Sequence, residues 1–135
     1  ISDLKRFLTE KGIVIRSNDK LIKFWKGMKK NSDGLVPAIT IDSVTKEVLM
    51  MAYMSYEAFE LTSNTGFMHY YSRSRKAMWK KGESSGHIQR VIEGRIDCDR
   101  DTLLYEVEQT GAACHTNNKS CFYTKLDDWD GESVE

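Results

Sequence analysis

The fold of this chain is decided by the stretch Leu35-Val-Pro-Ala-Ile-Thr-Ile-Asp-Ser-Val-Thr-Lys-Glu-Val-Leu-Met-Met-Ala-Tyr-Met54. Its first part, Leu35–Ile41, is short, apolar and rich in residues that favour β-strands. Asp42–Lys46 is typical of a turn, and Val48–Met54 is again apolar. Two such runs separated by a short polar segment predict a β-hairpin.

The residues before this hairpin show a helical pattern, which Asn31-Ser-Asp-Gly34 interrupts. Small polar residues that can cap a helix precede two sets of apolar residues. The caps and apolar sets are Ser2 before Leu4, Phe7 and Leu8, and Asn18 and Asp19 before Leu21, Ile22, Trp25 and Met28. We therefore expect residues 1–34 to form a helical N-terminal segment.

After the hairpin, Ser55 is placed to cap a helix that Gly66 ends. Further strands are predicted over Phe67–Ser72, His87–Asp97 and Leu103–Gln109. The sequence thus predicts a single α+β domain over residues 1–135. Its core is an antiparallel β-sheet, with short helices at the N-terminus and between strands. Residues 127–135 form an acidic tail.

Composition restricts the functional classes. The 135 residues contain 20 Lys and Arg and 20 Asp and Glu, so the formal net charge is zero. That balance argues against a general nucleic-acid binder and against a polybasic membrane-surface protein. The longest apolar run, Val48–Met54, is far shorter than a membrane span. No apolar signal-like segment opens the sequence, and we expect a cytoplasmic protein.

An acidic run, Asp97-Cys-Asp-Arg-Asp101, forms the first candidate site. If it is extended, Asp97, Asp99 and Asp101 share one face and Cys98 points to the other. Three neighbouring carboxylates repel each other unless a cation holds them, and oxygen ligands suit Mg²⁺. A solvated acidic strand end is the alternative. An EF-hand calcium loop is disfavoured because Thr102 occupies the position where the sharp turn needs glycine.

The three cysteines, Cys98, Cys114 and Cys121, are an odd number and make a poor disulfide framework. They are either buried core residues or three thiolate ligands of a tetrahedral zinc site. His115 follows Cys114 and can either close such a site or act beside it as an acid–base group. Because Cys98 faces away from its aspartate neighbours, we hypothesise that it reaches into the site of a partner subunit.

A basic stretch between residues 71 and 86 is the third candidate. It combines five cations within nine residues with serine hydroxyls and accessible glycine backbone, a mixture that suits phosphate. The alternative is a solvated basic hairpin. The stretch contains Arg73, Arg75, Lys76, Lys80, Lys81, Ser72, Ser74, Ser84, Ser85, Gly82 and Gly86.

These motifs together resemble the phosphoribosyl-AMP cyclohydrolase family of histidine biosynthesis. The resemblance runs from about Leu35 to Tyr123, and four motifs occur in the family's order. They are Tyr71-Ser-Arg-Ser-Arg, Trp79-Lys-Lys-Gly-Glu-Ser-Ser-Gly-His-Ile-Gln89, Asp97-Cys-Asp-Arg-Asp101 and Ala113-Cys-His-Thr-Asn-Asn-Lys-Ser-Cys-Phe-Tyr123. One departure is Asn117, where the family usually has glycine. We expect the same turn because Asn tolerates a left-handed backbone.

The resemblance implies a zinc- and magnesium-dependent hydrolase that opens the adenine ring of 1-(5-phosphoribosyl)-AMP at the N1–C6 bond. It also implies an intertwined homodimer with metal sites at the subunit interface. The implied zinc ligands are Cys114, Cys121 and Cys98 from the other subunit, and the implied magnesium ligands are Asp97, Asp99 and Asp101.

Under this hypothesis zinc lowers the pKa of a water molecule, hydroxide adds to C6, and His115 handles the protons. Magnesium would hold the substrate phosphates together with Arg73, Arg75, Lys81 and Ser84 or Ser85. Trp79 and Tyr71 either stack on the base or pack in the core. His69 and His87 are secondary acid–base candidates with a structural alternative.

Two other classes of function remain as alternatives. A nucleobase deaminase also uses zinc and attacks a purine at C6, but its His-x-Glu and Pro-Cys-x-x-Cys signature is absent. A non-catalytic, zinc-stapled interaction module would explain the cysteines but not the three aspartates beside the basic stretch.

Overall fold

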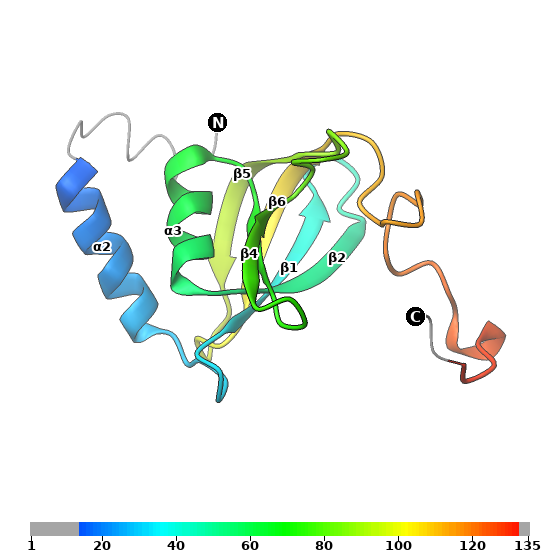
Figure 1. Ribbon diagram of the computed structural model, residues 1–135, viewed down its shortest axis with the longest axis horizontal. Helices are drawn as coiled ribbons and strands as arrows, with labels where there is room; N and C mark the ends of the chain where they lie inside the picture. Colours follow the sequence, from blue (N-terminus) through cyan, green and yellow to red (C-terminus); the bar gives the residue numbers. More distant parts are fainter. Residues whose placement is uncertain (1–13, 133–135) are drawn as a thin grey trace.

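The predicted hairpin is confirmed. The computed structural model describes residues 14–132, and in it β1 (Val36–Asp42) pairs antiparallel with β2 (Val48–Met54), as Figure 1 shows. Asp42 shapes the turn, because its Oδ1 accepts hydrogen bonds from the backbone N–H groups of Val44 (2.8 Å) and Thr45 (2.9 Å). These bonds lower the pKa of the Asp42 carboxyl against the opposing effect of burial.

Six strands form one sheet in the order β4-β3-β2-β1-β6-β5. The four not yet introduced are β3 (His69–Ser72), β4 (Ala77–Lys80), β5 (Gln89–Ile96) and β6 (Leu103–Gln109). The α+β class is confirmed, but the sheet is mixed, because β1 and β6 run parallel while the other neighbours run antiparallel. The alternation of apolar and polar residues shows which face of a strand is buried. It does not show whether a strand distant in the sequence pairs with it parallel or antiparallel.

The sheet curls so that the residues before β3 reach β5. Phe67 forms an isolated antiparallel bridge with Arg90. The N–H of Met68 donates to the Gln89 carbonyl at 3.0 Å, and the N–H of Val91 donates to the Gly66 carbonyl at 2.8 Å. The chain entering β3 therefore lies against β5, and the sheet encloses its own core.

Helix α3 (Tyr56–Thr65) begins and ends where the sequence predicts. Ser55 is its N-cap and accepts a hydrogen bond from the N–H of Ala58. Gly66 ends it in a left-handed conformation with φ of 82°. Both signals are local, which is why they fix the bounds of the helix.

Helix α2 (Val14–Gly27) differs from the prediction, since Asn18 and Asp19 lie inside it and are not its cap. The expected buried face is correct for Leu21 and Met28, whereas Ile22 is 39% exposed. Trp25 packs against Tyr56 and Phe59 of α3. The predicted helix with Ser2, Leu4, Phe7 and Leu8 lies outside the described residues.

A buried polar chain crosses the apolar core. The Tyr70 hydroxyl contacts the Thr40 hydroxyl at 2.7 Å and donates to Gln89 Oε1 at 2.6 Å. Gln89 Nε2 in turn donates to Gln109 Oε1 at 2.7 Å. Gln109 Nε2 donates to the carbonyls of residues 87, 88 and 110. Burial raises the pKa of Tyr70, so its hydroxyl stays neutral and available as a donor.

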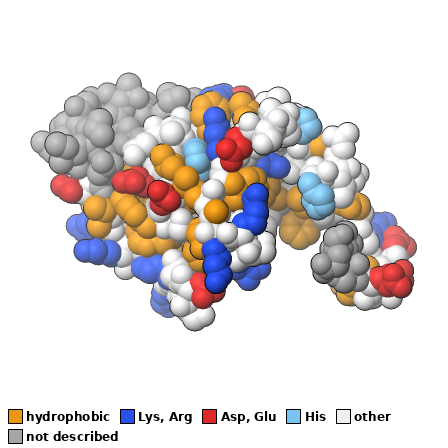
Figure 2. Space-filling view, viewed as in Figure 1, with side chains coloured by type: hydrophobic (Ala, Val, Ile, Leu, Met, Phe, Trp, Pro, Cys, Tyr) orange, Lys and Arg blue, Asp and Glu red, His pale blue; other side chains and the backbone are white. Residues whose placement is uncertain are grey.

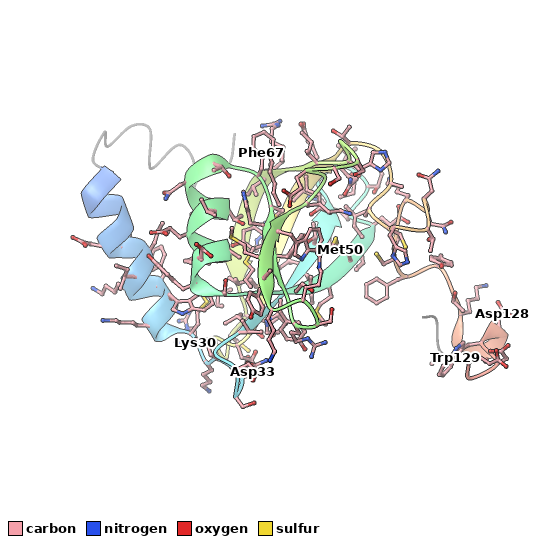
Figure 3. The ribbon with its side chains drawn as sticks, in the orientation of Figure 1. Lys30, Asp33, Met50, Phe67, Asp128 and Trp129 are labelled. Atoms are coloured by element: carbon pink, nitrogen blue, oxygen red, sulfur yellow. The ribbon has the colours of Figure 1, made fainter. Side chains whose placement is uncertain are left out.

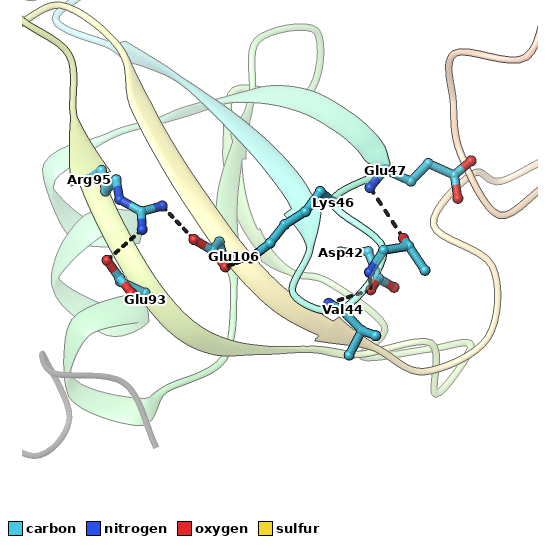
Figure 4. Close-up of polar contacts among 8 residues, drawn as sticks. Asp42, Val44, Lys46, Glu47, Glu93, Arg95 and Glu106 are labelled. Carbon is cyan, nitrogen blue, oxygen red and sulfur yellow. Dashed lines mark hydrogen bonds and ion pairs between the residues drawn. The ribbon is translucent and has the colours of Figure 1, made fainter.

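Glu106 of β6 carries an ion-pair network on the other surface of the sheet, shown in Figure 4. It receives Lys46 from the hairpin turn at 2.6 Å and Arg95 from β5, which also pairs with Glu93 at 2.9 Å. No helix among residues 14–132 is long and apolar enough to cross a membrane. A short 3₁₀ helix (Leu126–Asp128) contains the first residues of the acidic tail, and Figure 1 shows it away from the sheet.

Candidate active site

The segment 113–121 brings two of the three cysteines together. It folds back on itself through hydrogen bonds from the N–H of Ala113 to the Lys119 carbonyl and from the N–H of Cys114 to the Asn118 carbonyl, both 3.1 Å. Asn117 has φ of 72°, so the left-handed turn expected at this position is present.

Cys121 is anchored on β2. Its N–H donates to the Leu49 carbonyl at 2.7 Å, and the Ser120 hydroxyl donates to the Val48 carbonyl at 2.6 Å. These bonds bring the Cys121 thiol close enough to the thiol of Cys114 for each to shift the pKa of the other.

The surroundings shift the pKa values of the two thiols in opposite directions. Burial opposes ionisation of Cys114, but hydrogen bonds from Thr116 and Cys121 and the charge of Lys81 lower its pKa overall. Desolvation and the neighbouring Cys114 raise the pKa of Cys121 to about 11. The two thiols therefore titrate as a coupled pair, in which the surroundings favour the thiolate at Cys114 and the neutral thiol at Cys121.

Cys98 does not join this pair within one chain. It is exposed in the turn between β5 and β6, beyond Ile96. The pair lies beyond the other end of the same strands, after Gln109, so roughly 20 Å of strand separates the two places. The predicted extended run is wrong in detail, because residues 97–102 form a turn in which Arg100 has φ of 67°.

The three aspartates nevertheless meet. Asp97, Asp99 and Asp101 offer carboxylate oxygens that all lie within 4.8 Å of one another. Asp97 Oδ1 accepts the N–H of Asp101 at 3.0 Å and of Thr102 at 3.2 Å. Despite some desolvation, these bonds lower the pKa of Asp97, whereas the contact with Asp97 raises the pKa of Asp101. This mutual effect is what close carboxylates produce.

The basic stretch forms a hairpin of β3 and β4, the second of which was not predicted as a strand. A groove of about 290 Å³ lies on it. Arg73, Arg75 and Trp79 line the groove, and the Arg73 guanidinium lies 4.2 Å from the centre of the Tyr53 ring. Figure 2 shows Lys and Arg side chains gathered over this hairpin. The remaining lining residues are Met51, Ala52, Tyr53, Tyr71 and Ser72.

A second hollow of about 230 Å³ shares Arg73 and Tyr71 with the groove and adds Asp33, Leu35 and Lys76. The connection from α2 to β1 lines this hollow, and its Lys29 N–H donates to the Arg100 carbonyl of the acidic turn at 2.7 Å. Residues 29–35 therefore touch both the arginine-lined hollow and the aspartate turn. Sequence reasoning missed these residues, and it missed Met51 and Tyr53, whose positions in an alternating strand were the available signal.

Trp79 connects the groove to the cysteines. One face of its ring packs on Tyr70, with centroids 5.2 Å apart, and Lys81 Nζ lies 5.9 Å from the ring centre. Trp79 thus packs against the core and lines the groove at once. Lys81, two residues on, reaches the same side of the strand. It donates to the Ala113 carbonyl and not into the groove.

The other predicted site residues are distributed around the cysteine end of the sheet. Ser84 and Ser85 are exposed in the turn after β4 and do not line either hollow. His115 is exposed directly after Cys114. His69 is buried with Nδ1 2.8 Å from the Phe67 carbonyl, and burial lowers its pKa. His87 packs against Gly111, where an added Cβ would lie 2.5 Å from its ring.

Comparison with known sequences is decisive at this point. The phosphoribosyl-AMP cyclohydrolase family matches residues 50–123. The chain belongs to this family. The phosphoribosyl-AMP cyclohydrolase of Archaeoglobus fulgidus is 65% identical over 94 residues, which is 70% of this chain and 87% of that protein.

Two further phosphoribosyl-AMP cyclohydrolases agree. That of Methanoregula boonei is 60% identical over 100 residues, covering 74% of this chain and 81% of its own. That of Haloquadratum walsbyi is 63% identical over 97 residues, covering 72% and 74%. The family match includes the groove hairpin, the aspartate turn and both cysteines of the pair, so the resemblance stated from the motifs is confirmed.

Proposed function

We propose that this cyclohydrolase hydrolyses the N1–C6 bond of the adenine ring in 1-(5-phosphoribosyl)-AMP, as a zinc- and magnesium-dependent homodimer in the cytoplasm. The observation that carries the proposal is the closeness of the groove to the cysteine loop. Trp79 lines the arginine groove, and Lys81 Nζ lies 5.9 Å from the Trp79 ring centre and donates to the carbonyl of Ala113, the residue before Cys114.

The cysteine pair fits zinc. Two soft sulfur donors lie near each other at the end of a hydrogen-bonded loop, and thiolates are ligands that zinc prefers. Cys114 and Cys121 would hold the metal with Cys98 of the partner subunit. When bound, zinc would lower the pKa of a water molecule toward neutrality.

The aspartate turn fits magnesium. Asp97, Asp99 and Asp101 present only oxygen donors, close enough together for one hard cation. These three residues would hold the ion, which would offset phosphate charge. The contact of Lys29 with this turn, and the presence of Asp33 beside Arg73, support a common phosphate region.

The chain's own side chains then divide the work. Arg73 and Arg75 bind phosphate through guanidinium N–H groups, and the groove-facing surface of Trp79 receives the base. His115 accepts the proton of the attacking water as its oxygen bonds to C6. The C6–N1 bond then breaks as C6 becomes the carbonyl carbon of a carboxamide, the hydroxyl on C6 loses its proton to solvent, and His115 returns the first proton to N1.

A homodimer is proposed because one chain separates its cysteines. Cys98 and the pair lie at opposite ends of β5 and β6, so a second copy is needed to bring them together. Large apolar side chains beyond the pair are also exposed in the single chain, as expected of a surface that another subunit covers. They are Phe122 (64%), Tyr123 (52%), Leu126 (84%) and Trp129 (54%).

One experiment tests the proposal against both alternatives. Metal content and the absorbance change of ring opening are measured on the same purified sample, with ammonia assayed in parallel. We expect bound zinc and ring opening without ammonia. Ammonia release would indicate a deaminase, and zinc without turnover would indicate a binding module. Either result would overturn the proposed reaction.

A further inference from the structure

Lys81 is placed differently from a phosphate-binding lysine. Its Nζ donates to the carbonyl of Ala113, a residue only 2% exposed that directly precedes Cys114. The side chain is half-buried and passes over Trp79. The ammonium group is thus attached to the backbone of the cysteine loop.

The backbone around Lys81 leaves this side chain little freedom. The Lys81 N–H donates to the Met68 carbonyl at 3.0 Å. Gly82 follows with φ of 83°, and an added Cβ there would lie 2.5 Å from the carbonyl carbon of His87. The backbone therefore fixes the direction in which the Lys81 side chain leaves the chain, and the bond from Nζ to the Ala113 carbonyl holds its end at the cysteine loop.

The ionisable groups whose charge acts on Lys81 are the two thiols of the pair. Among residues 14–132 Lys81 forms no ion pair with a carboxylate, and its electrostatic interactions are with Cys114 and Cys121. Two adjacent thiolates repel each other, and an ammonium group beside both reduces that repulsion. Polar groups that orient metal ligands commonly change metal affinity by roughly 10- to 100-fold when removed.

We propose that Lys81 is a positioning residue of the cysteine pair, which fixes the Ala113–Cys114 backbone and offsets the negative charge of the thiolates, and that it is not a ligand of a substrate phosphate. The inference deepens the proposed function and rests on it for the identity of the metal.

The chain offers a closely matched control in Lys30. Lys30 Nζ also donates to backbone carbonyls, those of Trp25 and Met28 at 2.8 Å, and it also lies over a tryptophan ring at 5.7 Å. Figure 3 shows Lys30 at the end of the sheet away from Phe67. Lys81 lies at the Phe67 end, because its backbone N–H donates to the carbonyl of Met68. Lys30→Met therefore removes the same kinds of contact far from the cysteines.

The test compares Lys81→Met, Lys81→Gln, Lys81→Arg and Lys30→Met in the full-length protein. Zinc affinity is measured by competition with a colorimetric chelator, and kcat and KM are measured at saturating zinc. We expect Lys81→Met to weaken zinc binding by roughly 10- to 100-fold and to lower kcat more than it changes KM. Lys81→Gln keeps a donor for Ala113 and should fall between, whereas Lys81→Arg and Lys30→Met should retain zinc affinity.

The opposite pattern would overturn the inference: zinc affinity unchanged in Lys81→Met, with KM raised. Hydrogen exchange of residues 113–121 in the metal-free protein gives a readout that does not depend on zinc or on turnover. Faster exchange in Lys81→Met than in Lys30→Met supports the positioning role, and equal exchange refutes it. A protein that lacks ring-opening activity in its unaltered form refutes the proposed function, while the exchange comparison still decides the role of Lys81.

Discussion

Replacing Gly111 by alanine tests how the loop that leads to the cysteine pair is packed. Gly111 has φ of 70°, and an added Cβ would lie 2.5 Å from Cδ2 and 2.8 Å from Cγ and Nε2 of His87. The left-handed backbone costs an L-residue about 1–2 kcal/mol. Forcing a methyl group against a packed ring costs about 1–3 kcal/mol more. Gly111→Ala should therefore destabilise the protein by roughly 2–5 kcal/mol.

Two other glycines separate these contributions. Gly34 has a similar φ of 76° but nothing within 4 Å of an added Cβ, so Gly34→Ala should cost only about 1–2 kcal/mol. Gly82 has φ of 83° and would meet backbone atoms of His87, which cannot rotate away. A second substitution, His87→Ala, should therefore recover about 1–3 kcal/mol in Gly111→Ala and nothing in Gly82→Ala.

The assay is urea unfolding followed by tryptophan fluorescence, with all variants in one metal buffer. The free energies of the single and double variants give the coupling between residues 87 and 111. Equal destabilisation by Gly111→Ala and Gly34→Ala would refute the packing of His87 on this loop. So would strict additivity in the His87→Ala, Gly111→Ala double variant.

Three further predictions concern the site and the acid stability. Cys114→Ala should lose bound zinc and ring-opening activity together, and full activity would contradict zinc catalysis. His115→Ala should keep zinc, measured by metal analysis, and lower kcat by roughly 10²- to 10⁴-fold; loss of zinc would instead make His115 a ligand. Hydrogen bonds from Lys46 and Arg95 lower the pKa of Glu106 below 4.5, so their stabilisation is present above about pH 4.5 and is lost as pH falls through the folded-state pKa. Glu106→Gln should flatten the fall in unfolding free energy below pH 4.5, and an unchanged pH profile would contradict that assignment.

Local signals in the sequence were sufficient for the hairpin and for α3. Ser55 and Gly66 act within one helical turn of themselves, so the bounds of α3 follow from residues close in the chain. Strand β4 was missed because it has only four residues, which are mixed in polarity. Its position depends on the packing of Trp79 against Tyr70, which is a tertiary contact. The parallel pairing of β1 with β6 joins residues 65 positions apart, such as Ala38 and Leu103, which no local pattern encodes.

The sequence predicted which residues gather at the candidate site better than it predicted where their side chains point. Cys114 and Cys121 and the three aspartates come together as grouped from the sequence. The aspartates do so in a turn, because Arg100 adopts a left-handed backbone, and not through strand alternation. Lys81 was identifiable as a cation, but its target depends on a contact with Ala113, 32 residues away. Side-chain direction at that range is set by the tertiary fold.

The most direct test of a shared active site is complementation between two inactive variants. Cys98→Ser and Cys114→Ser are purified separately, mixed in equal amounts under conditions that exchange subunits, and assayed for ring opening. Each mixed dimer would contain one intact set of Cys98, Cys114 and Cys121, so activity should recover to about one quarter of that of the unaltered protein. No recovery after demonstrated subunit exchange, or full activity of Cys98→Ser alone, would contradict an active site completed by a second copy of the chain.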